Sequence, residues 1–141
     1  VAPLCYQLSR DGKRLISGGG DGKVLLWDLE SGKVLQSIQA FREPVFDLQF
    51  NGDESKIIAS SWDATVRIYD LSSGKMDSYQ DLKNNSAYCV RFLPGDLYYI
   101  TGKLDNSIEM WEIDTKTVVR TFTGHTGIIS ALHTTADGKI L

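Results

Sequence analysis

An internal repeat of 42 residues dominates this sequence and limits the folds that it can form. The repeat is marked by aromatic residues followed by acidic ones at equal intervals: Trp27-Asp28, Tyr69-Asp70 and Trp111-Glu112. Three copies align without gaps, over residues 9–50, 51–92 and 93–134, and a fourth begins at residues 135–141. A period of about 40 to 45 residues is typical of proteins that stack copies of one supersecondary unit. The fold can therefore be predicted one unit at a time.

Within each unit the residues around the aromatic position have the composition of β-strands. Val24 to Trp27, Val66 to Tyr69 and Ile108 to Trp111 are rich in β-branched and aromatic residues, and helical spacing of apolar residues is nowhere sustained. Turn dipeptides, which allow positive φ angles and side-chain bonds to the backbone, separate the strands. They are Asp11-Gly12, Asp21-Gly22, Ser31-Gly32, Ser73-Gly74, Pro94-Gly95 and Asp137-Gly138. The pattern predicts an all-β chain in which each unit forms four short antiparallel strands.

The position of these turns predicts where the sheets lie. We expect three consecutive four-stranded sheets near residues 3–39, 45–81 and 87–123, with part of a fourth at residues 129–141. For the first sheet the strands are expected near residues 3–8, 14–18, 23–28 and 33–38, and the later sheets repeat this order.

Three features that stand at their expected places within the 42-residue repeat resemble the WD-repeat propeller family. They are the dipeptides Trp27-Asp28 and Trp111-Glu112, an aspartate six residues before each aromatic residue (Asp21, Asp63 and Asp105), and Gly124-His125 before the last predicted strand. Family members close a ring of about four to eight four-stranded blades. The resemblance covers essentially the whole chain, and it implies a partial β-propeller of about three blades and part of a fourth. Three blades alone would leave unpaired strand edges and blade faces at both ends, which invite association. We expect the remaining blades to come from the same longer chain and not from several copies of this one.

Some positions depart from the family pattern. Tyr69 stands where the family has tryptophan, Glu112 replaces aspartate, and the Gly-His slot reads Ala40-Phe41 and Leu82-Lys83. These changes leave the second and third blades without the full family motif, and the histidine of the first blade would precede Val1.

The resemblance implies a buried hydrogen-bonded set in each blade, made of a tryptophan, a hydroxyl, a histidine and the turn aspartate. Such a set stabilises the fold only when every member has a partner. The residues expected in these structural roles are Ser17, Asp21 and Trp27 in the first blade, Asp63 and Tyr69 in the second, Thr101, Asp105 and Trp111 in the third, and His125 for the fourth. In the second blade the hydroxyl slot falls on Ala59 or Ser60. The alternative is that the aspartates only cap their own turns.

Composition argues against several classes of function. Fifteen basic and eighteen acidic residues give a net charge of -3, without the basic footprint of a nucleic-acid binder. No apolar run approaches the roughly 18 residues that cross a bilayer. His125 and His133 have no cysteine or carboxylate at ligand spacing, so we expect neither a metal nor a cofactor. Cys5 and Cys89 occupy equivalent positions two repeats apart and are expected as buried thiols of an intracellular protein, cytoplasmic or nuclear.

The function implied by the resemblance is a non-catalytic scaffold for protein or peptide partners. One alternative is a substrate adaptor of a ubiquitin-ligase or signalling complex, which needs a docking motif outside the propeller. Another is a propeller enzyme with its active site in the central channel, which needs clustered polar residues on the innermost strands. Those strands offer only Asp47, Gln49, Arg91 and His133, so an enzyme is not expected.

Family geometry places the partner-binding loops on the face that carries the hairpin before each turn aspartate. The residues expected there are Phe41, Arg42 and Glu43, then Lys83, Asn84 and Asn85, with Trp62 and Lys103 beside the second and third hairpins. Trp62 is the best candidate, because Gly20 and Leu104 at the equivalent positions show that the blade does not require an indole. The alternative to partner binding is that the Trp62 ring lies over its own hairpin. Phe46 and Tyr88 are second-rank candidates, since their strand phase also allows them to lie in the core.

Overall fold

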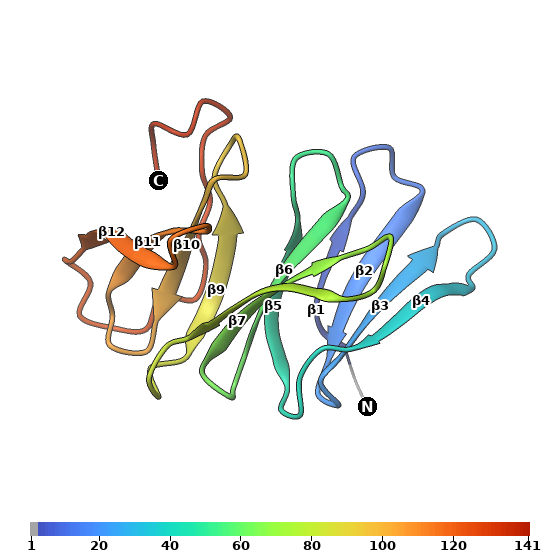
Figure 1. Cartoon of the computed structure of the whole chain (residues 1–141), viewed down its shortest axis with the longest axis horizontal. Helices are drawn as coiled ribbons and strands as arrows, with labels where there is room; N and C mark the ends of the chain where they lie inside the picture. The colour runs from blue at the N-terminus through green and yellow to red at the C-terminus, as the bar shows by residue number, and fades with distance from the viewer. Residues whose placement is uncertain (1–2) are drawn as a thin grey trace.

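The computed structural model describes residues 3–141, and every regular element in that range is a β-strand (Figure 1). The strands form three four-stranded antiparallel sheets in chain order. Sheet 1 contains β1 (Pro3–Leu8), β2 (Arg14–Gly19), β3 (Lys23–Asp28) and β4 (Val34–Gln39). Sheet 2 contains β5 (Val45–Phe50), β6 (Lys56–Ser61), β7 (Thr65–Asp70) and β8 (Met76–Asp81). Sheet 3 contains β9 (Ala87–Phe92), β10 (Tyr98–Lys103), β11 (Ile108–Glu112) and β12 (Thr117–Phe122). The prediction of an all-β chain with four-stranded blades is confirmed.

The hairpin between the second and third strand of each sheet turns through one residue with positive φ. This residue is Gly22 in sheet 1, with a φ of 77°, and a Cβ added there would lie 2.2 Å from the carbonyl oxygen of Phe41. Ala64 and Asn106 occupy the same position in sheets 2 and 3, with φ values of 62° and 68°. The turn therefore keeps its shape although only the first copy has the residue best suited to it.

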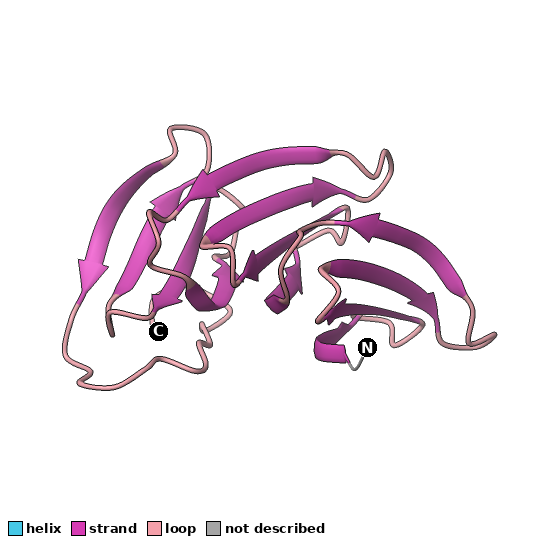
Figure 2. Ribbon diagram, turned by 90° about the horizontal axis from the view of Figure 1, so that it is seen from below, coloured by secondary structure: helices cyan, strands magenta, loops and turns pink. Residues whose placement is uncertain are grey.

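The three sheets lie side by side, with β1, β5 and β9 as neighbouring inner strands (Figure 2). Two glutamines tie these strands together. Gln7 Oε1 accepts a hydrogen bond from the backbone N–H of Phe50 at 2.7 Å, and Gln49 Oε1 accepts one from Phe92 at 2.6 Å. Each glutamine on an inner strand thus satisfies an N–H on the next inner strand, and we call these two bonds the glutamine clamps.

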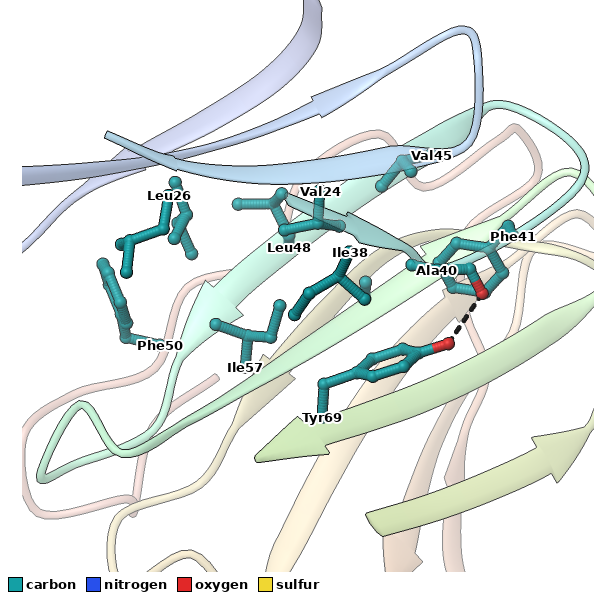
Figure 3. Close-up of a cluster of buried hydrophobic side chains, with 12 residues drawn as sticks. Val24, Leu26, Ile38, Ala40, Phe41, Val45, Leu48, Phe50, Ile57 and Tyr69 are labelled. Carbon is teal, nitrogen blue, oxygen red and sulfur yellow. Dashed lines mark hydrogen bonds between the residues drawn. The ribbon is translucent and has the colours of Figure 1, made fainter. Parts of the chain in front are cut away.

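Seam 1/2 is the interface between sheets 1 and 2, and its centre is apolar (Figure 3). Its buried residues are Ile16, Val24, Leu26, Ile38, Ala40, Phe41, Val45, Leu48, Phe50, Ile57, Ala59 and Tyr69. They come from the strand faces that alternate inward from each sheet, so the period of two along each strand produces this core.

Seam 2/3 is the equivalent interface between sheets 2 and 3. Its buried apolar residues are Ile58, Val66, Ile68, Leu82, Ala87, Val90, Phe92, Tyr99 and Trp111. Sheet 2 therefore buries both of its faces, because Ile57, Ala59 and Tyr69 face sheet 1, whereas Ile58, Val66 and Ile68 face sheet 3.

A small residue lies where β2, β6 and β10 approach the next inner strand. A Cβ added to Gly18 would lie 2.6 Å from Val45 Cγ1, so no side chain fits there. Sheet 2 carries Ser60 at this position, and opposite it Ala87 takes the place of Val45. Ser60 is larger than Gly18, and the residue that faces it, Ala87, is smaller than Val45. The two changes compensate each other, as close packing requires.

Residues 123–141 form no strand, although part of a fourth blade was expected at residues 129–141. Ile129 and Leu132 are nonetheless buried against sheet 3, and the Cys89 thiol donates to the Ile129 carbonyl at 3.5 Å. Thr135 and Ile140 close a hairpin turn through backbone and side-chain hydrogen bonds. The segment lies along sheet 3 where an inner strand would lie, and within residues 3–141 no strand pairs with it.

Candidate interaction surface

Four loops meet along one edge of the molecule, the lower edge in Figure 1. They are the connections between β4 and β5 and between β8 and β9, and the hairpins β6–β7 and β10–β11. Trp62 joins these loops. Its backbone N–H donates to Pro44 O at 3.1 Å, and its backbone carbonyl accepts from Ser86 Oγ at 3.2 Å. The Leu104 N–H in turn donates to Ser86 O at 3.1 Å. The predicted loops are therefore fixed to one another by backbone bonds.

Three aromatic side chains form a row on this edge, which we call the aromatic row: Trp62, Phe46 and Tyr88. Trp62 is 54% exposed, and its ring meets the ring of Phe46 at 5.6 Å and 85°. Phe46 stacks on Tyr88 at 4.9 Å and 28°. Phe46 and Tyr88 are half-buried at equivalent positions of adjacent inner strands, and this places them together. Trp62 thus contacts a neighbouring aromatic side chain and leaves about half of its own surface open.

The polar residues predicted beside Trp62 are exposed. Arg42, Glu43, Lys83 and Asn84 all lie on the surface, and within residues 3–141 none of their side chains makes a hydrogen bond or ion pair. Lys83 and Asn84 have φ angles of 53° and 65°, an uncommon conformation for two successive residues with side chains. Asn85 differs, because its side chain donates to Asp105 Oδ2 at 2.6 Å and is held in the hairpin.

Two residues predicted to contact a partner are buried instead. Phe41 is 2% exposed, and the Arg67 guanidinium lies over its ring at 5.0 Å. Lys103 is 7% exposed, and its Nζ donates to Glu109 Oε1 at 2.9 Å. Phe41 has a cation–π partner in Arg67 of β7, and Lys103 has an ionic partner in Glu109 of β11, the neighbouring strand of the same sheet. Neither is available to a partner in this structure.

The expected indole–hydroxyl pair forms in sheet 1 alone among the three sheets. Trp27 Nε1 donates to Ser17 Oγ at 2.9 Å. In sheet 3, Trp111 Nε1 and Thr101 Oγ1 are buried and have no partner within the described residues. In sheet 2 the Tyr69 hydroxyl instead donates to Ala40 O at 2.8 Å, a bond drawn in Figure 3. The aromatic residue of the set therefore bonds to a hydroxyl in sheet 1, to a backbone carbonyl in sheet 2, and to no group of residues 3–141 in sheet 3.

The turn aspartates cap their own hairpins. Asp21 accepts from the N–H of Lys23, Asp63 from that of Thr65 and Asp105 from that of Ser107. Burial alone would raise the pKa of Asp105, but hydrogen bonds from Ser107 and Asn85 outweigh it and lower the pKa. None of the three aspartates contacts a histidine, since Phe41 and Lys83 occupy that slot and His125 is exposed.

The outward face of sheet 1 is open. Trp27, predicted as a buried anchor, is half-buried and borders a hollow of about 480 Å³ with Tyr6, Leu15 and Leu25. Trp111, its equivalent in sheet 3, is 8% exposed because sheet 2 covers it. No sheet precedes β1 within residues 3–141, so the corresponding apolar face of sheet 1 remains uncovered.

The polar residues of the inner strands join the sheets and do not converge on one point. Asp47 forms an ion pair with Arg91 and accepts the N–H of Val90 at 2.9 Å. Burial raises the pKa of Asp47 although Arg91 opposes the shift. Gln49 belongs to a glutamine clamp, and His133 is exposed. Within residues 3–141 no three His, Cys, Asp or Glu side chains come together as a metal site.

The two cysteines are unpaired thiols. Cys89 is buried and Cys5 half-buried, and burial raises the pKa to about 11 for Cys89 and to about 12 for Cys5. Both thiols are thus protonated and unreactive near neutral pH. The part of the chain that the structure describes also contains no helix long and apolar enough to cross a membrane.

Three groups that shape the seams were not predicted from the sequence: Arg67, Glu109 and the glutamine clamps. Gln7 and Gln49 are 42 residues apart, so the repeat itself could have identified the clamps. Arg67 and Glu109 also occupy one repeat position, but their opposite charges hide the shared role.

Comparison with known proteins gives concordant matches. The family model described as WD domain, G-beta repeat, matches residues 3–28 and 32–70. The chain is 26% identical over 141 residues to nuclear distribution protein PAC1 of Arthroderma otae, covering 90% of this chain and 30% of that protein. It is 23% identical over 129 residues to nuclear distribution protein nudF 1 of Talaromyces marneffei, covering 88% and 28%. It is 23% identical over 120 residues to pre-mRNA-processing factor 19 of Bos taurus, covering 84% and 24%. The chain thus spans less than a third of the length of these relatives.

Proposed function

Because this chain belongs to the WD-repeat family, we propose that it is a non-catalytic scaffold that binds protein or peptide partners through the loops around Trp62. WD-repeat proteins are typically interaction scaffolds. The inner strands support this assignment, because their polar side chains bond to neighbouring strands. A catalytic site would need such groups to converge on a substrate.

The exposed ring of Trp62 is the observation that carries the proposal. An indole with 54% of its surface in water costs free energy that a soluble domain recovers when a partner covers it. Gly20 and Leu104 hold the equivalent positions without a large aromatic ring, so packing of the hairpin does not explain Trp62. Tryptophan is also among the residues that contribute most to binding at interfaces.

Arg42, Lys83 and Asn84 complete the proposed surface. They border Trp62 on two sides, since the Trp62 backbone bonds to Pro44 in one loop and to Ser86 in the other. Arginine at the border of an aromatic anchor supplies hydrogen-bond donors and stacking area. Phe41 and Lys103 are buried and are not part of the proposed surface.

The open face of sheet 1 fits a scaffold that forms part of a larger propeller. Tyr6, Leu15, Leu25 and Trp27 occupy the positions that are covered in sheets 2 and 3. We assign this face to a further blade of the same longer protein, and we place that protein inside the cell, where the unpaired thiols of Cys5 and Cys89 persist. Nucleic acid and membrane are not among the proposed partners.

The test is an affinity pull-down with the full-length protein. Partners recovered by the parent should be reduced several-fold by Trp62→Ala and by Arg42→Ala. Leu97→Ala is the matched control, because Leu97 is 62% exposed in the hairpin between β9 and β10, at the opposite edge. Undiminished recovery with both variants, at an unchanged melting temperature, would place the binding site elsewhere.

A further inference from the structure

The aromatic row has the shape of a corner. Trp62 stands at 85° to Phe46, and Phe46 lies nearly parallel to Tyr88. Flat apolar rings pack into such a corner with two aromatic surfaces at once. Aromatic-lined surfaces of this kind dock proline-rich segments in several recognition modules.

The row also provides hydrogen-bond donors that the protein leaves unused. Trp62 bonds to its neighbours through its backbone only, and among residues 3–141 neither its indole N–H nor the Tyr88 hydroxyl has a partner. Arg42, Lys83 and the Asn84 amide add donors nearby. A polyproline II segment presents the complementary chemistry, because proline has no N–H and its carbonyl oxygens remain free to accept.

The length of the row suits this conformation. The ring centroid of Phe46 lies 5.6 Å from that of Trp62 and 4.9 Å from that of Tyr88. One turn of polyproline II rises about 9 Å over three residues, so one turn can extend along all three rings. The segment also keeps its extended form before binding and therefore loses little conformational entropy.

Charge does not select another class of ligand here. Arg42 and Lys83 are balanced by the exposed carboxylates of Glu43 and Asp105. A strongly acidic or basic peptide would meet both signs, and its charge would bring little net attraction.

We propose that the aromatic row binds a proline-rich peptide segment in the polyproline II conformation, with proline rings against Trp62 and Phe46 and carbonyl oxygens facing the Trp62 indole and the Tyr88 hydroxyl. This proposal rests on the interaction role proposed above and names the partner chemistry of the same surface.

The experiment measures the fluorescence anisotropy of fluorescein-labelled decaproline titrated with the full-length protein. Gly-Ser and alternating Asp-Ala peptides of equal length are the comparison ligands. Decaproline should bind, and Trp62→Ala should raise its Kd by about tenfold or more. Trp62→Phe keeps a ring but removes the indole N–H. Its Kd should lie between that of the parent and that of Trp62→Ala. Tyr88→Phe should raise the Kd by a few-fold, and Leu97→Ala should leave it unchanged.

The outcomes separate this inference from the proposed function. Decaproline binding no tighter than Gly-Ser binding, or a Kd unaffected by Trp62→Ala, would overturn the inference. Trp62-dependent binding of the Asp-Ala peptide in place of decaproline would also overturn it. In either case a pull-down that still depends on Trp62 would leave the scaffold function standing. A pull-down that does not depend on Trp62 would remove both.

Discussion

The two seams of this protein share one backbone arrangement but contain different side chains. In seam 1/2 the Tyr69 hydroxyl and the Arg67 guanidinium both donate to Ala40 O, and Arg67 also pairs with Asp63. In seam 2/3 the same two positions carry Trp111 and Glu109. There Glu109 pairs with Lys103, while four buried polar atoms have no partner within the described residues. They are Ser60 Oγ, Thr101 Oγ1, Glu109 Oε2 and Trp111 Nε1.

The difference shows which part of a repeat is fixed and which part can change. Strand register and turn geometry are set locally, and they persist in all three sheets. Side chains that meet across a seam need only fill the space and provide hydrogen-bond partners for each other. One pair can therefore be replaced by another. Seam 1/2 has nearly complete hydrogen bonding, whereas seam 2/3 combines a buried ion pair with unsatisfied groups. Stability should therefore respond differently to equivalent changes in the two seams.

Trp111→Ala should produce the largest effect. Trp111 is 8% exposed within seam 2/3, and its loss should reduce the free energy of unfolding by about 3–5 kcal/mol. In a protein limited to these 141 residues, Trp27→Ala should cost about 1–2 kcal/mol, because Trp27 borders an open hollow and loses one hydrogen bond to Ser17. Urea denaturation of each variant measures both values. Equal losses at the two positions would contradict the difference in burial.

Glu109→Leu should cost about 3 kcal/mol, because it leaves the Lys103 ammonium buried without its partner. The double variant Lys103→Met with Glu109→Leu should return to within about 1 kcal/mol of the parent, since an apolar pair fits a buried site. Asp77→Ala is the control, because its ion pair with Lys56 is exposed and should contribute less than about 1 kcal/mol. A double variant no more stable than the single one would show that the ion pair is not the cause.

Gly18→Ala should cost about 1–3 kcal/mol, since the new Cβ would lie 2.6 Å from Val45 Cγ1 and 2.7 Å from Cys5 Sγ. Adding Val45→Ala copies the Ser60 and Ala87 arrangement of seam 2/3 and should recover part of that loss. Ser60→Ala should be neutral or slightly stabilising, because the Ser60 hydroxyl has no partner among residues 3–141. Thermal melts of these three variants and of Val45→Ala alone test this, and strictly additive effects of the Gly18 and Val45 changes would argue against direct packing.

The effects of pH are spread over several pH units, and they should differ between the seams. Cys5 and Asp47 occupy equivalent positions, and burial raises the pKa of each, to about 12 for Cys5 from an ordinary 9.0. A raised pKa means that the folded protein holds the proton more tightly than the unfolded chain. The stabilising contribution is then complete below the unfolded pKa and is lost as pH rises through the folded one.

The contribution of Cys5 should therefore decrease above about pH 9, by at most about 1.4 kcal/mol per pH unit, and that of Asp47 should decrease from about pH 4 upward. Urea midpoints across pH should show a smaller alkaline slope in Cys5→Ser, lose it in the double variant Cys5→Ser with Cys89→Ser, and lose the acidic slope in Asp47→Asn. An alkaline slope that survives the double variant would assign it to other groups.

Local features of this fold were predictable from the sequence, and contacts across the seams were not. The strands around Trp27 and Trp111 and the turns at Asp21 and Asp105 follow from residue type and spacing over a few positions. The exposure of Trp62 followed from comparison with Gly20 and Leu104. The burial of Phe41 and Lys103 did not, because each depends on one charged side chain: Arg67 lies over the Phe41 ring, and Glu109 of the neighbouring strand β11 pairs with Lys103. A sequence repeat fixes which positions face a seam but does not identify which pairs form there.

The glutamine clamps also determine how the chain would respond to mechanical force. Gln7 and Gln49 each hold the following inner strand, but the third position of the series is Arg91, whose side chain has no acceptor atom. Nothing equivalent holds Thr134, and residues 123–141 are attached to sheet 3 by Ile129, Leu132 and the Cys89 thiol. Tension applied at Leu141 would therefore peel this segment away one contact at a time at low force. The clamped inner strands would separate only later, when their hydrogen bonds must break together.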